Sequence, residues 1–217
     1  MPEDLHRHAT LVDQREPQRP KTVRARHAAS LLVWREAGET TEILMGMRGA
    51  RHRFMPNRLV FPGGAVDRAD LSAPFATGLS PRTEAALRRN ANARLAHGLS
   101  VAAARELREE TGFSLGSPPA LDGLDYLARA VTPTDSPIRF NARFFCIHAS
   151  RVTGALGGDG ELDNLRYYGM TEALALDLAG PTRRMLEQLR TWLTMSEAER
   201  NERTHVPVLK DRGWRLE

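Results

Sequence analysis

Residues 104–113, Ala-Arg-Glu-Leu-Arg-Glu-Glu-Thr-Gly-Phe, constrain the fold of this chain more than any other segment. Glu106, Glu109 and Glu110 stand at i, i+3 and i+4, a spacing that places their carboxylates on one face of a helix. Leu107 and the alanines before this run supply an apolar surface for packing. The segment therefore predicts a helix that packs against a sheet on one side and presents three carboxylates on the other.

Three neighbouring carboxylates require a compensating cation. At this spacing each like-charged pair destabilises a bare helix by about 0.2–0.5 kcal/mol. Because an all-oxygen ligand set selects hard divalent cations, Glu106, Glu109 and Glu110 predict a site for Mg²⁺ or Mn²⁺. Arg105 can reach Glu109 one turn along the helix and hold its rotamer. Taken alone, the run would also suit a solvent-exposed helix with Arg–Glu pairs, so its surroundings decide between the two interpretations.

The rest of the pattern predicts an α/β domain. We expect strands at residues 28–34, 42–47, 126–131 and 139–148, with a turn around Gly38 between the first two. Residues 1–24 carry scattered charge and prolines without periodicity, which predicts a flexible N-terminal arm. The folded domain is therefore expected over residues 25–217.

Helices are expected at three places, namely Arg82 to Ala96 after Pro81, Val101 to Thr111 between the N-cap Ser100 and Gly112, and Pro181 to about Thr194. The stretch 71–99 is polar and rich in Ala and Arg, which predicts an insertion containing the first of these helices.

The breaker Pro62-Gly63-Gly64 follows a short apolar stretch at residues 59–61. Glycine lets the backbone turn freely or approach a ligand closely, so a functional loop is expected here. The preceding loop, residues 48–58, is rich in arginine, whose planar fork binds phosphate through two donors at once.

Composition excludes several classes of protein. Cys146 is the single cysteine, so neither a disulfide framework nor a cysteine-based metal site can form, and a reducing cytoplasm is the expected location. No run of about 18 apolar residues is present, so no membrane partner is expected. The net charge of +4 and pI of 9.8 suit a polyanionic ligand. No basic-aromatic motif accompanies this charge, so no nucleic acid is expected.

The surroundings of the acidic helix resemble a known motif. Phe-Pro-Gly-Gly at residues 61–64 precedes it, and residues 105–113 match Arg-Glu-hydrophobic-X-Glu-Glu-X-Gly-hydrophobic at every specified position. In these two halves the chain resembles the Nudix family, and the resemblance extends from about residue 28 to about residue 193. It implies an α/β/α sandwich with a mixed β-sheet and a hydrolase that cleaves diphosphate linkages with the help of a divalent metal.

The spacer between the two halves is longer than in the family pattern. Gly64 and Arg105 lie 41 positions apart, 27 more than the pattern has, so the helical insertion at 71–99 falls inside the Nudix box. The pattern also has a glutamate six residues after the glycine, and here that place is taken by Asp70.

One branch of the family, the coenzyme A and acyl-CoA diphosphatases of animal peroxisomes, has a long insertion at this point and resembles the chain further. The likeness rests on Arg48, Phe-Met-Pro at 54–56, Val-Phe-Pro-Gly-Gly-Ala-Val-Asp at 60–67, Thr-Pro at 132–133 and the strand at 139–145. Coenzyme A or an acyl-CoA is therefore the substrate that the resemblance favours.

The resemblance also implies a role for each matching residue. Arg105, Glu106, Glu109 and Glu110 form the expected catalytic set, and the three glutamates would bind Mg²⁺ or Mn²⁺ together with the backbone carbonyl of Gly63. A metal-bound water then attacks phosphorus, so no protein nucleophile is needed. Which glutamate would serve as general base stays open.

The expected substrate-binding residues are Arg48, Arg53, Gly63 and Gly64. Alternatives remain, because the family's general coenzyme A signature is only half present, with Gly49 and Asn57 at two of its places. One alternative is a Nudix pyrophosphatase for ADP-ribose or a dinucleotide. Another is a non-catalytic Nudix-like module that binds a ligand. The expected partner is a small-molecule nucleotide, and a homodimer is left open.

Overall fold

The computed structural model describes residues 23–49, 56–211 and 213–217, so the expected arm lies almost entirely outside the described residues. The helices are α1 (Pro81–Arg88), α2 (Ala93–Thr111), α3 (Met170–Ala175), α4 (Gly180–Thr194) and α5 (Glu197–Glu202), with a 3₁₀ turn at Ala149–Arg151. The main-sheet strands are β1 (Arg26–Ala37), β2 (Thr40–Arg48), β3 (Leu59–Val60), β4 (Gly63–Ala65), β6 (Asp125–Val131), β7 (Phe140–His148), β9 (Leu162–Gly169), β10 (Pro207–Lys210) and β11 (Gly213–Leu216).

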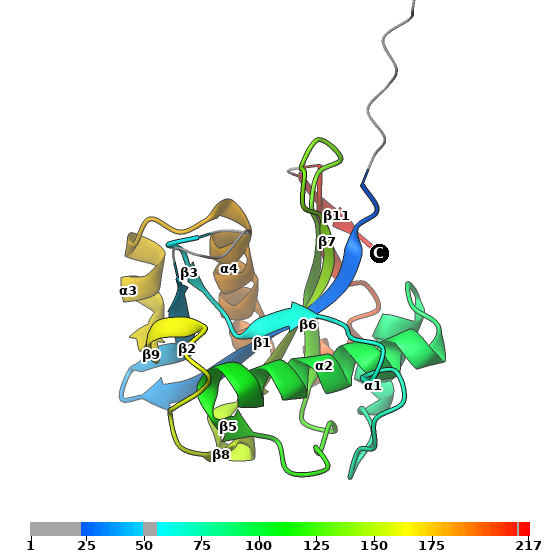
Figure 1. Cartoon of the computed structure of the whole chain (residues 1–217), viewed down its shortest axis with the longest axis horizontal. Helices are drawn as coiled ribbons and strands as arrows, with labels where there is room; N and C mark the ends of the chain where they lie inside the picture. Colours follow the sequence, from blue (N-terminus) through cyan, green and yellow to red (C-terminus); the bar gives the residue numbers. More distant parts are fainter. Residues whose placement is uncertain (1–22, 50–55, 212) are drawn as a thin grey trace, which may run out of the picture.

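One mixed sheet forms the centre of the molecule (Figure 1). Its strand order is β11-β10-β6-β7-β1-β2-β3, with β4 added beside β1 and β9 beside β2. The pairs β1–β7 and β6–β10 are parallel, and the remaining pairs are antiparallel. A separate pair joins β5 (Phe113–Ser114) to β8 (Thr153–Gly154). The mixed sheet predicted from the sequence is confirmed.

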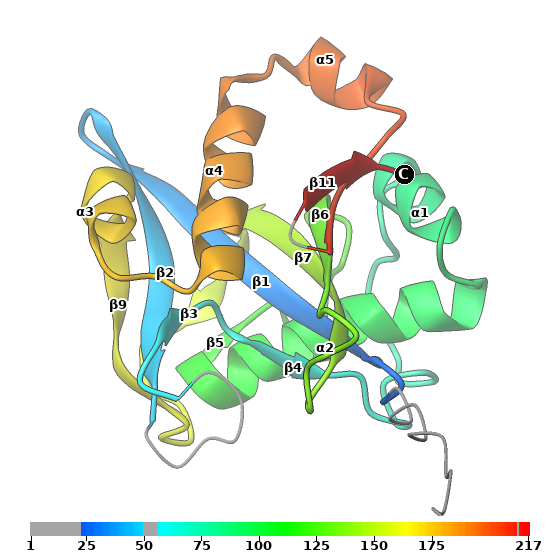
Figure 2. The same ribbon diagram turned by 90° about the horizontal axis from the view of Figure 1, so that it is seen from above.

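Alternation along the central strand divides the core into two layers. Ala29, Leu31 and Val33 of β1 pack into the core beneath α2, whereas Leu32 belongs to the core beneath α4. This is the period-2 alternation of a strand covered on both faces. Figure 2 shows α2 and α4 on opposite sides of β1, which gives the three layers that the sequence implied.

The helix that carries the glutamates is longer than predicted. It begins at Ala93, where the side chain of Asn92 accepts a hydrogen bond from the Leu95 amide, and not after Ser100. Ser100 lies inside the helix, and its hydroxyl donates to the carbonyl of His97 at 2.8 Å. The N-cap prediction was wrong because the buried face continues upstream through Ala96 and Leu99 and extends the helix.

The predicted helix from Arg82 to Ala96 is likewise corrected. The structure divides it into α1, which ends at Arg88, and the first turns of α2, with a break between them. The stretch 71–99 therefore comprises α1 and the beginning of the glutamate-bearing helix. Three elements that the sequence did not indicate follow α4, namely α5, β10 and β11. Within the described residues, no helix is both long and apolar enough to cross a membrane.

Candidate functional site

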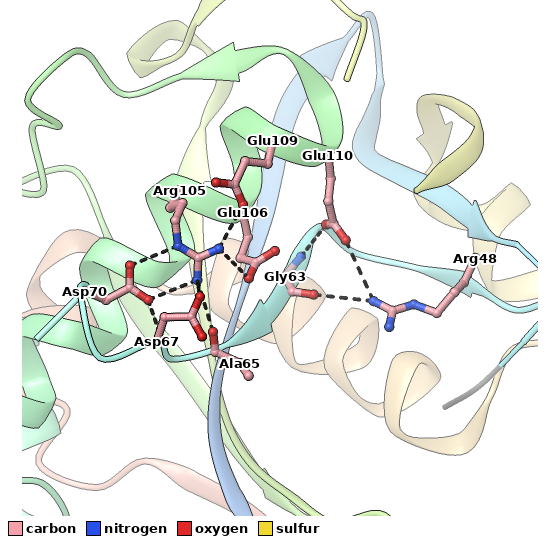
Figure 3. Close-up of polar contacts among 9 residues, drawn as sticks. All are labelled: Arg48, Gly63, Ala65, Asp67, Asp70, Arg105, Glu106, Glu109 and Glu110. Carbon is pink, nitrogen blue, oxygen red and sulfur yellow. Dashed lines mark hydrogen bonds and ion pairs between the residues drawn. The ribbon is translucent and has the colours of Figure 1, made fainter. Parts of the chain in front are cut away.

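The second half of α2 positions the acidic residues. Leu107 is fully buried against the sheet, and Gly112 ends the helix in the left-handed conformation at φ 75°. This anchoring fixes the rotation of the helix about its axis. Figure 3 shows Glu106, Glu109 and Glu110 on adjoining turns, as their spacing predicted.

Arg105 holds the upstream end of this acidic face. Its Nε and Nη2 donate to the two carboxylate oxygens of Asp70 at 2.9 and 3.0 Å, and Nη2 also donates to the carbonyl of Ala65 at 3.1 Å. Its Nη1 donates to Glu106 and to Glu109, both at 2.9 Å. The predicted Arg105–Glu109 contact is confirmed, and these carboxylates raise the pKa of Arg105.

Asp70 thus has a defined structural role. It is 2% exposed and accepts hydrogen bonds from Nε and Nη2 of Arg105. It also accepts a hydrogen bond from the backbone amide of Asp67 at 2.8 Å. A bidentate pair of this kind fixes orientation as well as charge. Asp70 therefore orients Arg105, which in turn holds Glu106 and Glu109.

Glu110 lies in a different environment. It is 1% exposed, and its Oε2 accepts the backbone amide of Gly63 at 2.7 Å. Its Oε1 has no hydrogen-bond partner among the described residues, and the nearest cation, Nη2 of Arg48, is 3.9 Å away. Burial raises the pKa of Glu110 to about 8, although the Gly63 amide and Arg48 act in the opposite direction.

Gly63 and Gly64 lie in β4, where the sequence predicted a functional loop, and they allow this close approach. A Cβ on Gly64 would lie 2.3 Å from Oε1 of Glu106, and a Cβ on Gly63 would lie 2.5 Å from the carbonyl of Ala29. No side chain fits at either position without displacing the carboxylate or the strand. Gly63 and Gly64 thus serve to bring backbone against the acidic helix.

Arg48, the last residue of β2, contacts this strand. Its Nη2 donates to the carbonyl of Gly63 at 3.4 Å, a long contact, and its Nε has no hydrogen-bond partner among the described residues. Arg53, the other expected phosphate ligand, lies outside the described residues.

A cavity of about 690 Å³ opens beside these groups. Glu106 lines it, and burial raises the pKa of Glu106. Arg48, Gly63 and Gly64 also line it, so the structure brings together every described residue of the expected substrate-binding set. Arg105, Glu109 and Glu110 do not line the cavity, so Glu106 is the one member of the expected catalytic set among its described lining residues.

Glu161 lines the same cavity and was missed in the sequence. It follows a glycine-rich loop that caps the C-terminus of α2, in which the amides of Gly157 and Asp159 donate to the carbonyls of Thr111 and Glu109, both at 2.9 Å. The negative charge of Glu161 also raises the pKa of Glu106 and of Glu110. The run Gly-Gly-Asp-Gly-Glu at 157–161 was the only sequence signal, and it reads as an ordinary turn.

The carboxylate oxygens near the cavity are of the type that binds a hard divalent cation. Glu106, Glu110 and Glu161 offer only carboxylate oxygens, and Oε1 of Glu110 is buried without a hydrogen bond. Within the described part of the chain, however, no group of three or more His, Cys, Asp or Glu side chains is arranged around one point. The ion pairs of Arg105 with Glu106 and Glu109 occupy two of the carboxylates expected to bind metal.

Parts of this chain are similar to known Nudix proteins. Residues 96–189 match the model of the NUDIX domain. Nudix hydrolase 7 of Caenorhabditis elegans is 36% identical over 87 residues, which are 40% of this chain but only 21% of that protein. The chain thus matches about a fifth of the length of this curated relative.

Solved structures share the fold. A NUDIX hydrolase from Alicyclobacillus acidocaldarius superimposes with a TM-score of 0.59 at 25% identity, covering 76% of this chain and 90% of that one. The NUDIX domain of Shewanella oneidensis NrtR, solved with ADP ribose, gives 0.53 at 16% identity, covering 79% and 90%. The second likeness supports the fold alone.

Proposed function

We propose that this chain, whose residues 96–189 match the NUDIX domain model, is a Nudix hydrolase that cleaves the diphosphate linkage of a nucleoside diphosphate derivative. Coenzyme A or an acyl-CoA is the substrate that we propose. The single observation that supports catalysis is the buried Oε1 of Glu110, which has no hydrogen bond among the described residues and lies beside the cavity-lining Glu106. A buried carboxylate oxygen without a donor is costly unless a cation binds it.

The acidic residues of this chain would divide the work. Glu106, Glu109 and Glu110 would hold one or more Mg²⁺ or Mn²⁺ ions, with the Gly63 carbonyl as a further ligand. Such ions lower the pKa of a bound water and neutralise charge on the leaving phosphate. Asp70 and Arg105 would hold the upstream glutamates in place, while Arg48 would donate to phosphate oxygens at the cavity.

Glu161 is our further candidate for the general base. It lines the same cavity as Glu106, and it follows a loop that hydrogen-bonds to the C-terminus of α2. A base must reach the attacking water directly or through one more water. The three glutamates of α2 remain the alternatives.

The location and partners of the whole protein are also proposals. A single buried thiol, Cys146, supports a reducing compartment such as the cytoplasm. The cavity supports a small nucleotide as the partner.

The test is hydrolysis of a substrate panel with Mg²⁺ or Mn²⁺, with the products separated by chromatography. We expect adenosine 3′,5′-bisphosphate and a 4′-phosphopantetheine product from coenzyme A. Cleavage of ADP-ribose or a dinucleotide, without cleavage of coenzyme A, would support diphosphate hydrolysis but contradict coenzyme A as the substrate. Absence of hydrolysis across the panel would favour the non-catalytic module and contradict the proposal.

A further inference from the structure

The floor of the cavity has an unusual composition. Ala28 of β1 lies opposite Ala65 of β4 on one side and Ala142 of β7 on the other. Ala142 in turn lies opposite Ala130 of β6, and Ala130 lies opposite Leu209 of β10. Directly opposed residues point to the same face of a sheet, and all five of these side chains line the cavity. They form one continuous row across five strands, which we call the alanine row.

Larger side chains flank this row. Two positions along β7 in either direction, Phe140 and Phe144 also line the cavity, and Phe61 packs edge-on against Phe144 with ring centroids 6.5 Å apart. Side chains on one face of a strand recur every second residue, so small alanines between large aromatic rings make a groove. The groove runs across the strands and not along them.

The two ends of the row differ. At one end, Ala65 follows Gly64, whose backbone lies close to the Glu106 carboxylate. The carbonyl of Ala65 accepts a hydrogen bond from Arg105. At the other end, Leu209 closes the row from β10, a strand beyond the residues that match the NUDIX domain model. Four steps between neighbouring strands span about 19 Å. The groove therefore extends away from the acidic site over a distance that could hold an extended aliphatic chain.

The charged residues of the cavity lie off this row. Arg48, Glu106 and Glu161 line the cavity near the acidic site, and Arg26 and Arg184 line it elsewhere, but every member of the row is apolar. An apolar floor that continues from a phosphate-binding end fits a ligand with a charged head and an uncharged tail.

We infer that the alanine row is the binding surface for an extended apolar arm of the substrate, and that Ala130, Ala142 and Leu209 determine how long an arm is accepted. This inference rests on the proposed function, because it assumes that the diphosphate lies at the acidic site. The inference adds to that function a binding surface for the aliphatic chain of the substrate, such as the acyl chain of an acyl-CoA. Each methylene placed on the row should raise affinity about fourfold.

The test measures equilibrium binding of coenzyme A and of its butanoyl, octanoyl and dodecanoyl thioesters by calorimetry. The full chain carries Glu110→Gln throughout, so that the ligands are not consumed. We expect affinity to rise with chain length in this background. Ala142→Leu and Ala130→Leu should lower the affinity for dodecanoyl-CoA at least about tenfold, because a leucine fills the groove.

Two controls make the result specific. Adenosine 3′,5′-bisphosphate lacks the arm, so its affinity should not change in either alanine variant. Ala85→Leu places the same substitution at an exposed position of α1 outside the cavity and should leave all affinities unchanged. Leu209→Ala opens the far end of the row, so it should shift the preference toward longer chains.

The two hypotheses fail separately. Affinity that does not depend on chain length, or the same dependence with and without Ala142→Leu, would overturn the inference even if the wild-type chain cleaves coenzyme A. Binding that depends on chain length without any hydrolysis by the wild-type chain would instead overturn the proposed function.

Discussion

Two buried ionisable side chains in this molecule, Glu110 and Arg143, are both 1% exposed but have different surroundings. Arg143 donates to the carbonyls of Asn90 and Asn141 at 3.1 and 3.0 Å and to the ring of His27 at 3.1 Å. Glu110 has one oxygen bound to the Gly63 amide and the other without a hydrogen bond among the described residues.

Their places on the sheet also differ. Arg143 alternates along β7 with the cavity-lining Ala142 and Phe144, so its side chain points to the opposite face, toward the break between α1 and α2 at Asn90. Glu110 accepts the amide of Gly63, a cavity-lining residue of β4.

The difference distinguishes two uses of a buried charge. A buried group that has all its partners from the protein stabilises one arrangement of the chain. A buried group with one atom that forms no hydrogen bond, next to residues that line an open cavity, is instead available to a ligand. The contrast predicts that changes at Glu110 affect turnover and that changes at Arg143 affect stability.

The largest expected effect is on turnover in Glu110→Gln. The amide keeps the shape of the side chain but loses the charge that would hold the cation, so kcat should fall by about 100-fold or more. Steady-state hydrolysis of the substrate found in the panel measures it. Glu109→Gln should have an effect of the same order.

The fold should survive this substitution. Because burial disfavours the ionised carboxylate, metal-free Glu110→Gln should unfold in urea at the same or a higher concentration than the wild-type chain. Glu84→Gln, at an exposed position of α1, is the matched control for turnover. Full activity in both Glu109→Gln and Glu110→Gln would refute the metal-site assignment.

The second effect is on stability in Arg143→Leu. Leucine keeps an apolar body but leaves two carbonyls without their donor, so the free energy of unfolding should fall by about 3 kcal/mol. Urea unfolding at neutral pH measures it. Arg143→Lys keeps the charge with fewer donors and should lose less.

Turnover distinguishes this role from a catalytic one. At a temperature where the variant is folded, kcat of Arg143→Lys should stay within about threefold of the wild-type value, since Arg143 does not line the cavity. A loss of turnover comparable to that of Glu110→Gln would show that the contrast between the two sites is wrong.

The smallest effect is a pH dependence at His27. Burial, then the nearby Arg143, Arg24 and Arg129, lower the pKa of His27 below its ordinary 6.5. Above pH 6.5 the His27 ring is neutral in both the folded and the unfolded chain. Its protonation then costs the folded state no stability. As the pH falls, the unfolded chain takes up the proton first, so stability is lost down to the folded pKa.

His27→Gln removes this titration. The wild-type chain should lose stability relative to the variant between pH 8 and pH 5, by less than about 1 kcal/mol. Other groups titrate alike in both proteins, so the difference between the two urea midpoints isolates His27. A difference between the midpoints that does not change with pH would show that the titration of His27 does not affect stability.

The acidic face and the mixed sheet were predictable because their signals are local. Helical spacing sets Glu106, Glu109 and Glu110 on one side, and alternation sets the strands. The start of α2 was not predictable from Ser100, since a cap residue only permits a helix to begin and the burial of Ala96 and Leu99 extended it.

The sequence by itself determined which groups carry charge on α2 and where the backbone can approach them at Gly63 and Gly64. Only the tertiary structure decided that Asp70 holds Arg105 from 35 positions away, that Glu161 reaches the cavity, and that the alanine row is continuous. Spacing along one helix is fixed by its own geometry, whereas pairing between distant segments depends on strand register and packing.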